Sequence, residues 1–145
     1  MEDVKKIFYT DDDRDDQEIF KDAALEVSAG LQVWIQSDGG ELMNLLNNPP
    51  PKPHIIFLDL NMPVRNGYEI LQEIRESEQL KQFPVIVFST SDDIAAIDTT
   101  RKLGANLYIP KPSSYSLLKK VIRHSLSINW ETFAATEDNF VYRAN

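Results

Sequence analysis

Four short apolar runs of the chain are each followed by polar side chains that could bind a metal ion or a phosphoryl group. These side chains belong to Asp11, Asp12, Asp59, Asn61, Ser89 and Lys111. Carboxylates held close together repel one another, so a cation must neutralise them. Ligands made only of oxygen favour a hard cation, and a few carboxylates with room for water suit Mg²⁺ better than Ca²⁺. If the fold brings these residues together, the sequence predicts an Mg²⁺ site.

The same residue types could also transfer a phosphoryl group. A carboxylate, a lysine and a hydroxyl beside Mg²⁺ provide the groups that this reaction requires. One of the carboxylates would be the nucleophile and would become an acyl phosphate. The metal ion, the Lys111 ammonium and the Ser89 hydroxyl would then cancel charge on the phosphoryl oxygens.

The acidic cluster has a simpler explanation when it is considered alone. Asp13 can cap a following helix, and Asp15 and Asp16 suit a helix N-terminus, where the macrodipole is positive. Alternate acids also resemble an EF-hand loop, but Asp16 stands where that loop requires glycine. The joint placement of the acids, the hydroxyl and the lysine therefore decides the interpretation.

The apolar runs predict five strands, each followed by a helical pattern. The runs span residues 6–10, 31–35, 55–58, 84–88 and 106–109. The first, third and fourth are the most continuously apolar, as expected for central strands covered on both faces. The second run alternates with polar residues and the fifth leads into Pro110. Both features predict that these two strands lie at the edges of the sheet.

Strict alternation of strands and helices implies a parallel sheet with right-handed crossovers. We therefore predict an α/β fold of the flavodoxin-like (βα)5 type, with strand order 2-1-3-4-5 and helices on both faces. Ligands of open parallel sheets bind at the carboxyl ends of the strands. This order brings the candidate residues to one edge, with Asp59 at the switch point between the first and third strands.

Four motifs, in this order along the chain, resemble the receiver domain of two-component response regulators. The motifs are Tyr9-Thr10-Asp11-Asp12-Asp13, Leu58-Asp59-Leu60-Asn61-Met62-Pro63, Val87-Phe88-Ser89-Thr90 and Tyr108-Ile109-Pro110-Lys111-Pro112. The resemblance runs from about residue 5 to residue 126. In detail, the sequence is similar to small stand-alone receivers associated with phytochrome-type or other hybrid kinases. Ser89 stands where threonine is common, and Pro110 is less usual before the lysine.

The resemblance implies roles for the acidic residues and their neighbour. Asp59 would accept a phosphoryl group from a histidine kinase or a phosphotransfer protein. Asp12, Asp59 and the Asn61 carbonyl would bind Mg²⁺ directly, and Asp11 would bind it through water.

It also implies roles for residues of the fourth and fifth strands. Ser89 and Lys111 would hold the phosphoryl group, and Tyr108 would be an aromatic switch that turns inward as Ser89 moves. The family commonly has a cis bond at the position of Lys111–Pro112, which proline chemistry permits.

Two other functions can be weighed against this one. A haloacid-dehalogenase-like phosphatase also uses an aspartyl phosphate and Mg²⁺, but it requires an acid where this chain has Asn61. A pseudo-receiver that only binds partners would not need the complete set of acids, hydroxyl and lysine. We therefore expect a switch or relay that acts through protein contacts and is not a turnover enzyme.

Composition limits the class of partner and the location. With 145 residues and 42% hydrophobic content, the chain is expected to form one globular domain. A formal net charge of -8 and the lack of a basic stripe argue against nucleic acid as a partner. There is no cysteine, no signal-peptide pattern and no apolar run long enough for a membrane, so we expect a cytoplasmic protein.

The receiver is expected to span residues 1–128. The segment that follows, residues 129–145, is too short for a separate domain and is aromatic. Its rings belong to Trp130, Phe133, Phe140 and Tyr142. We favour packing of these rings on their own domain; the alternative is a homodimer or partner contact, because aromatic residues are enriched at interfaces.

Overall fold

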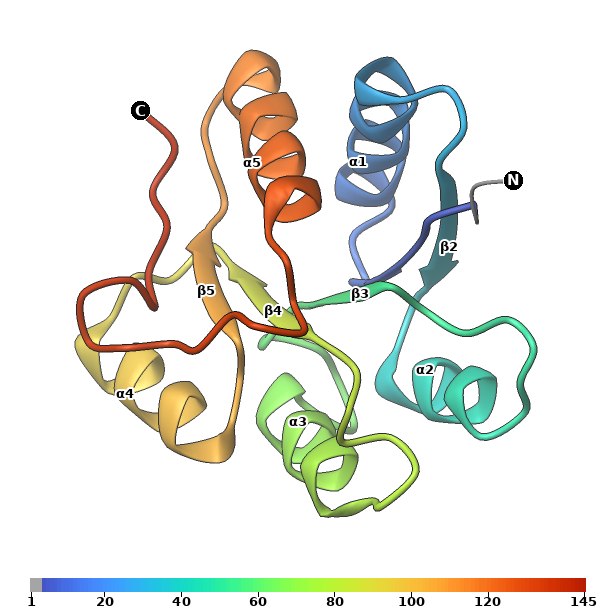
Figure 1. Ribbon diagram of the computed structural model, residues 1–145, viewed down its shortest axis with the longest axis vertical. Helices are drawn as coiled ribbons and strands as arrows, with labels where there is room; N and C mark the ends of the chain where they lie inside the picture. The colour runs from blue at the N-terminus through green and yellow to red at the C-terminus, as the bar shows by residue number, and fades with distance from the viewer. Residues whose placement is uncertain (1–3) are drawn as a thin grey trace.

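The computed structural model describes residues 4–145, along which five strands and five helices alternate (Figure 1). The strands are β1 (Lys6–Thr10), β2 (Gln32–Gln36), β3 (Ile55–Leu58), β4 (Val85–Ser89) and β5 (Leu107–Pro110). The helices are α1 (Arg14–Val27), α2 (Gly39–Leu46), α3 (Gly67–Glu76), α4 (Ile94–Leu103) and α5 (Tyr115–Ser127). The first three residues of the polar N-terminal segment lie outside the described residues.

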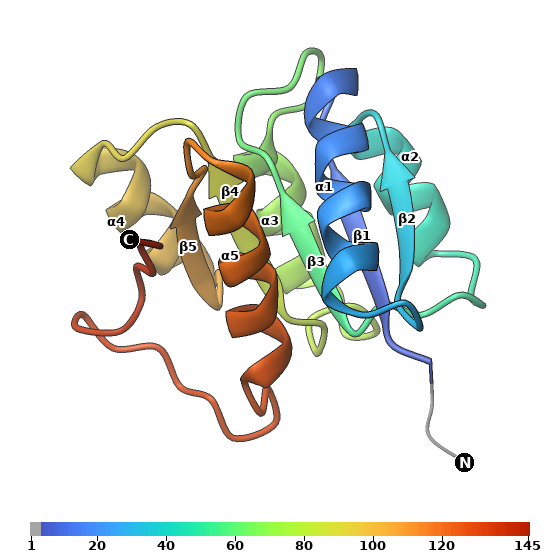
Figure 2. The same cartoon turned by 90° about the horizontal axis from the view of Figure 1, so that it is seen from above.

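The strands form one parallel sheet in the order β2-β1-β3-β4-β5, which confirms the predicted fold class. Helices α1 and α5 cover one face, and α2, α3 and α4 cover the other (Figure 2). Every residue of β3 and β4 is buried, as the continuous apolar runs predicted. No helix among residues 4–145 is long and apolar enough to cross a membrane.

Local signals fix where the helices begin and how closely they approach the sheet. Side chains of Asp13, Asp38, Asn66, Asp93 and Ser114 cap the five helices in chain order. Gly104 ends α4 with a φ of 99°, a conformation that glycine adopts without strain. At Gly67, a Cβ atom would lie 2.4 Å from the backbone oxygen of Asp59, so only glycine lets α3 begin directly against the end of β3.

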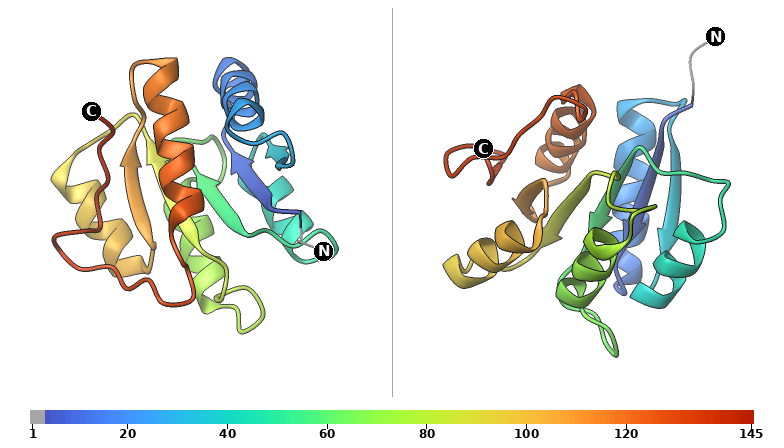
Figure 3. Two further views of the ribbon diagram at one scale, coloured as in Figure 1. Left: turned by 45° about the horizontal axis from the view of Figure 1, so that its top comes forward. Right: turned by 60° about the horizontal axis from the view of Figure 1, so that its bottom comes forward.

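The C-terminal segment packs along the β5 edge of the sheet (Figure 3, left). The Tyr108 N–H donates to the Phe140 carbonyl at 2.9 Å, and the Tyr142 N–H donates to the Tyr108 carbonyl at 3.0 Å. The Phe140 side chain is buried, and the Tyr142 ring stacks on His124 of α5 with 3.7 Å between ring centroids. These rings therefore pack on their own chain, the arrangement that we favoured.

Candidate functional site

The carboxyl ends of β1 and β3 bring together the three acids predicted as metal ligands. Asp11, Asp12 and Asp59 each offer a carboxylate oxygen, and these oxygens lie within 4.8 Å of one another. Asp11 and Asp59 are buried, whereas Asp12 is exposed. An all-oxygen group with one side open to solvent fits a hard divalent cation that keeps some of its water.

Backbone contacts between neighbouring strands position Asp59. Its N–H donates to the Thr10 carbonyl of β1 at 3.0 Å, so the end of β3 is held in register with the end of β1. The Asp59 Oδ1 atom accepts the N–H of Asn61 at 3.2 Å, and Asn61 itself is exposed beside the acids. Four predicted metal ligands therefore lie together at the carboxyl ends of β1 and β3: Asp11, Asp12, Asp59 and Asn61.

Lys111 crosses from the end of β5 to the acids of β1. Its Nζ lies 2.7 Å from Asp11 Oδ2, 2.9 Å from Asp16 Oδ2 and 3.6 Å from Asp59 Oδ2. The Lys111 N–H also donates to the Ser89 carbonyl at 2.8 Å, which ties β5 to the end of β4. The lysine is thus close to the predicted nucleophile, but it is hydrogen-bonded to two other carboxylates.

Burial and charge alter the acid–base properties of this cluster. Burial raises the pKa of Asp59 to about 6; the Lys111 charge opposes this rise and the Asp11 charge adds to it. Burial of the Lys111 ammonium opposes its charge, but the hydrogen bonds to Asp11 and Asp16 outweigh that effect and raise its pKa. Lys111 therefore remains charged at neutral pH, while Asp59 is a more basic carboxylate than usual.

The two predicted switch residues are Ser89, the last residue of β4, and Tyr108 of β5. Ser89 is fully buried, and its Oγ accepts the N–H of Ser91 at 3.2 Å. Tyr108 is also buried, and its hydroxyl donates to the Ser91 carbonyl at 2.7 Å. The Tyr108 ring therefore points into the protein, and its hydroxyl contacts the loop that follows Ser89.

One expectation about the backbone is wrong. Among the described residues, cis peptide bonds join Pro49 to Pro50 and Pro50 to Pro51, and the bond from Lys111 to Pro112 is trans. The trans form is the intrinsically favoured form of such bonds.

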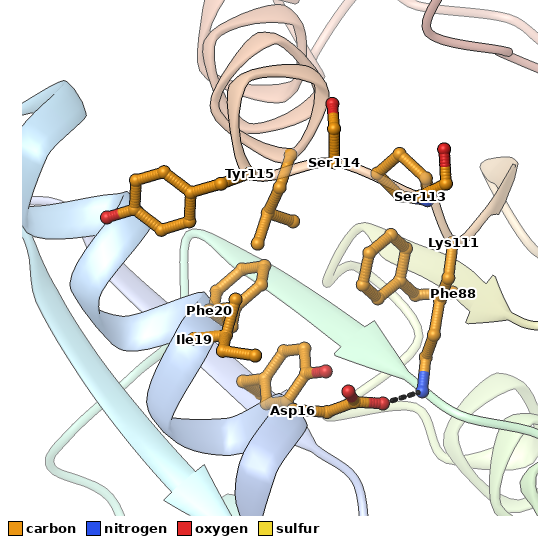
Figure 4. Close-up of a pocket in the computed structure, with 11 residues that line it drawn as sticks. Asp16, Ile19, Phe20, Phe88, Lys111, Ser113, Ser114 and Tyr115 are labelled. Carbon is orange, nitrogen blue, oxygen red and sulfur yellow. Dashed lines mark hydrogen bonds and ion pairs between the residues drawn. The ribbon is translucent and has the colours of Figure 1, made fainter.

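Two residues in contact with the site were not identified as site residues from the sequence. Tyr9 is buried, and its hydroxyl donates to Asp11 Oδ2 at 2.9 Å. Side chains two apart on a strand share a face, so the Tyr9-to-Asp11 spacing was a usable signal. Asp16 was interpreted only as a helix N-terminal charge, yet it is a partner of Lys111 (Figure 4).

Comparison with known proteins gives one consistent family. The sequence model of the response regulator receiver domain matches residues 7–123. The response regulator Rcp1 of Synechocystis sp. is 29% identical over 133 residues, covering 88% of this chain and 90% of the relative. The chemotaxis protein CheY1 of Helicobacter pylori is 30% identical over 105 residues, covering 72% of this chain and 77% of the relative.

Solved structures agree with the sequence comparison. The phosphorylated cyanobacterial phytochrome response regulator RcpA superposes with a TM-score of 0.79 at 31% identity, covering 92% of this chain and 98% of that chain. The Mn²⁺-bound form of Rcp1 superposes with a TM-score of 0.75 at 29% identity, covering 91% of this chain and 99% of that chain. These similarities extend over nearly all of the described residues.

Proposed function

The chain belongs to the family of response regulator receiver domains, and we propose that it is a switch phosphorylated on Asp59. A histidine kinase or a phosphotransfer protein would be the donor, and the phosphorylated protein would act through contacts with other proteins. The observation that carries this proposal is the meeting of three carboxylates and Lys111 at the carboxyl edge of the sheet.

The reaction requires a nucleophile held in place beside positive charge. An Asp59 oxygen forms a new bond to phosphorus while the bond between phosphorus and the donor breaks, and the donor keeps that electron pair. Register with β1 and the hydrogen bond from the Asn61 N–H fix the orientation of the Asp59 carboxylate. Lys111 and the Ser89 hydroxyl are the chain's own groups for holding the transferred phosphoryl oxygens.

We take Mg²⁺ as the ion for this site, held by Asp12, Asp59 and the Asn61 carbonyl. When bound, it would neutralise charge on the acids and on the phosphoryl oxygens. Asp11 already accepts hydrogen bonds from Tyr9 and Lys111 on Oδ2 and from the Asp13 N–H on Oδ1. This supports an indirect role for Asp11, through water.

Signalling would use the two predicted switch residues, Ser89 and Tyr108. We propose that Ser89 responds to the phosphoryl group and that Tyr108 reports that response at the β5 edge. The shared contact with Ser91 supports this coupling, because Ser89 accepts its N–H and Tyr108 donates to its carbonyl. Phosphorylation would shift a pre-existing equilibrium at this contact.

The remaining parts of the proposal concern the whole chain. The receiver would span residues 1–128, with 129–145 as a packed extension; the alternative is that the aromatic residues of this extension form a homodimer or partner contact. The protein would be cytoplasmic and would lose its own phosphoryl group without acting as a turnover enzyme.

Intact-mass measurement tests the function directly. With Mg²⁺ and acetyl phosphate, wild-type protein should gain the mass of one phosphoryl group, and Asp59→Asn should gain none. Equal labelling of this variant would contradict the assignment of Asp59. Turnover of a phosphomonoester would instead favour the phosphatase alternative, and no labelling by any donor would favour a pseudo-receiver.

A further inference from the structure

We propose that Asp16 is a positioning residue that restrains Lys111 in the unphosphorylated protein and thereby slows phosphorylation of Asp59. This inference rests on the proposed function, in which Lys111 must hold the transferred phosphoryl group. Asp16 lies in the first turn of α1, five residues beyond Asp11, and its carboxylate meets the Lys111 ammonium, which extends from the end of β5 (Figure 4).

The distances show where Lys111 rests before phosphorylation. Its Nζ donates hydrogen bonds to Asp11 Oδ2 at 2.7 Å and Asp16 Oδ2 at 2.9 Å, whereas Asp59 Oδ2 is 3.6 Å away and is not a hydrogen-bond partner. Because the Lys111 side chain is only 12% exposed, these carboxylates take the place of its water. Bonds from Lys111 to a phosphoryl group must therefore replace bonds that the lysine already makes.

The two carboxylates that hold Lys111 differ in what they lose when it moves. Asp11 keeps the Tyr9 hydroxyl and the Asp13 N–H as donors, so it remains satisfied although it is buried. The Asp16 side chain is 38% exposed and lines an open pocket of about 340 Å³ between α1 and α5, so water can replace the lysine there. The free energy needed to release Lys111 from Asp16 is therefore modest, and it adds to the barrier for phosphorylation of Asp59.

If Asp16 acted only by stabilising helix α1, its neighbour Asp15 would have the same role. Asp15 lies in the same first turn of α1, carries the same charge and is exposed, without an ion pair or side-chain hydrogen bond to Lys111. Asp15→Asn and Asp16→Asn make the same change in net charge and in the interaction with the helix macrodipole. The difference between these two variants isolates the contact with Lys111.

The experiment measures two rates for each protein by intact mass: labelling by acetyl phosphate with saturating Mg²⁺, and loss of the label after the donor is removed. Asp16→Asn should label about fivefold faster than wild type, equivalent to about 1 kcal/mol in the barrier. Its rate of loss should stay within about twofold of wild type, because Lys111 has already left Asp16 in the phosphorylated protein. Asp15→Asn should match wild type in both rates.

A conservative variant and a stability measurement separate restraint from damage. Asp16→Glu keeps the carboxylate and should label at a rate near that of wild type, and all three variants should unfold within a few degrees of wild type. The inference is overturned if Asp16→Asn labels no faster than Asp15→Asn, or if Asp16→Glu labels as fast as Asp16→Asn. Wild-type protein that accepts no phosphoryl group would overturn the proposed function itself.

Discussion

The crowding of like charges around Asp59 predicts that Asp59→Asn stabilises the metal-free protein at neutral pH. The Asp59 side chain is 9% exposed, and its carboxylate lies near those of Asp11 and Asp12. Burial is the main cause that raises its pKa from 3.8 to about 6. This rise corresponds to roughly 3 kcal/mol of destabilisation when the carboxylate is ionised.

Relaxation and water entry reduce this figure, so we expect a gain of about 1–2 kcal/mol from the substitution. For a domain of this size, that gain is a rise in Tm of about 3–6 °C. The asparagine is close in shape, and its oxygen can still accept the Asn61 N–H that now donates to Asp59 Oδ1 at 3.2 Å. The main change is therefore the loss of one buried negative charge.

The pH dependence follows from the sign of the shift. The folded protein binds a proton at Asp59 more tightly than the unfolded chain does, so the contribution of Asp59 to the stability of the wild-type protein falls as the pH rises from about 4 to about 6. Well below pH 4 the carboxyl is protonated in both states, and the advantage of the variant should vanish. Above about pH 6 the advantage should be complete.

Thermal unfolding in a chelator at several pH values tests this reasoning. The difference in Tm between Asp59→Asn and wild type should be small at pH 4 and several times larger at pH 7.5. A variant that melts at or below the wild-type temperature at pH 7.5 would refute the argument from charge crowding. A positive difference that is the same at both pH values would show that the gain does not come from ionisation.

Three further substitutions test separate parts of the structure. Asp12→Asn should raise the Tm in chelator and weaken Mg²⁺ binding measured by titration, because it removes one of three crowded acids; a lower Tm in chelator would count against this. Gly67→Ala places a Cβ atom 2.4 Å from the Asp59 carbonyl oxygen, so it should cost about 1–3 kcal/mol and slow labelling; an unchanged Tm would disprove the close approach. Phe140→Ala should cost about 3 kcal/mol in denaturant unfolding, since this ring is 1% exposed and packs near Tyr108; a loss below about 0.5 kcal/mol would show that the extension is not held on β5.

The sheet and its edge could be predicted because local signals agreed with one another. Continuous apolar runs marked β3 and β4 as central, and the structure buries all of their residues. Pro110 marked β5 as an edge strand, which the topology bears out. Strand order then placed the candidate residues at one edge without any knowledge of side-chain positions.

The contacts of Lys111 could not be predicted in this way. Several carboxylates follow β1 within a few residues, and which of them a long lysine side chain reaches depends on rotamers and on where α1 begins. The predicted strand order placed Asp11 and Lys111 at the same edge of the sheet, but Asp16 was given only the role of a helix N-terminal charge. In the structure the Asp13 carboxylate accepts the Asp16 N–H at the start of α1, and the Asp16 carboxylate accepts a hydrogen bond from Lys111.

The pairing of the C-terminal extension with β5 was also outside the reach of sequence patterns. Tyr108 and Val141 are far apart in the chain, and the pairing consists of one isolated bridge with two backbone hydrogen bonds around it. Aromatic content indicated that the segment would pack somewhere, but period and propensity carry no information about which edge it meets. An edge strand has free hydrogen-bonding groups that can accept such a pairing, but both β2 and β5 are edge strands, so this property does not select β5.

Phosphorylation of Asp59 can be tested by locating the phosphoryl group on the chain. Wild-type protein labelled with acetyl phosphate and Mg²⁺ can be reduced with borohydride, which converts an aspartyl phosphate to homoserine, and the digested peptides can then be sequenced by mass spectrometry. Homoserine is expected at position 59 alone. Homoserine at position 11 or 12, or at no position in a labelled protein, would contradict the assignment of Asp59 as the phosphorylated residue.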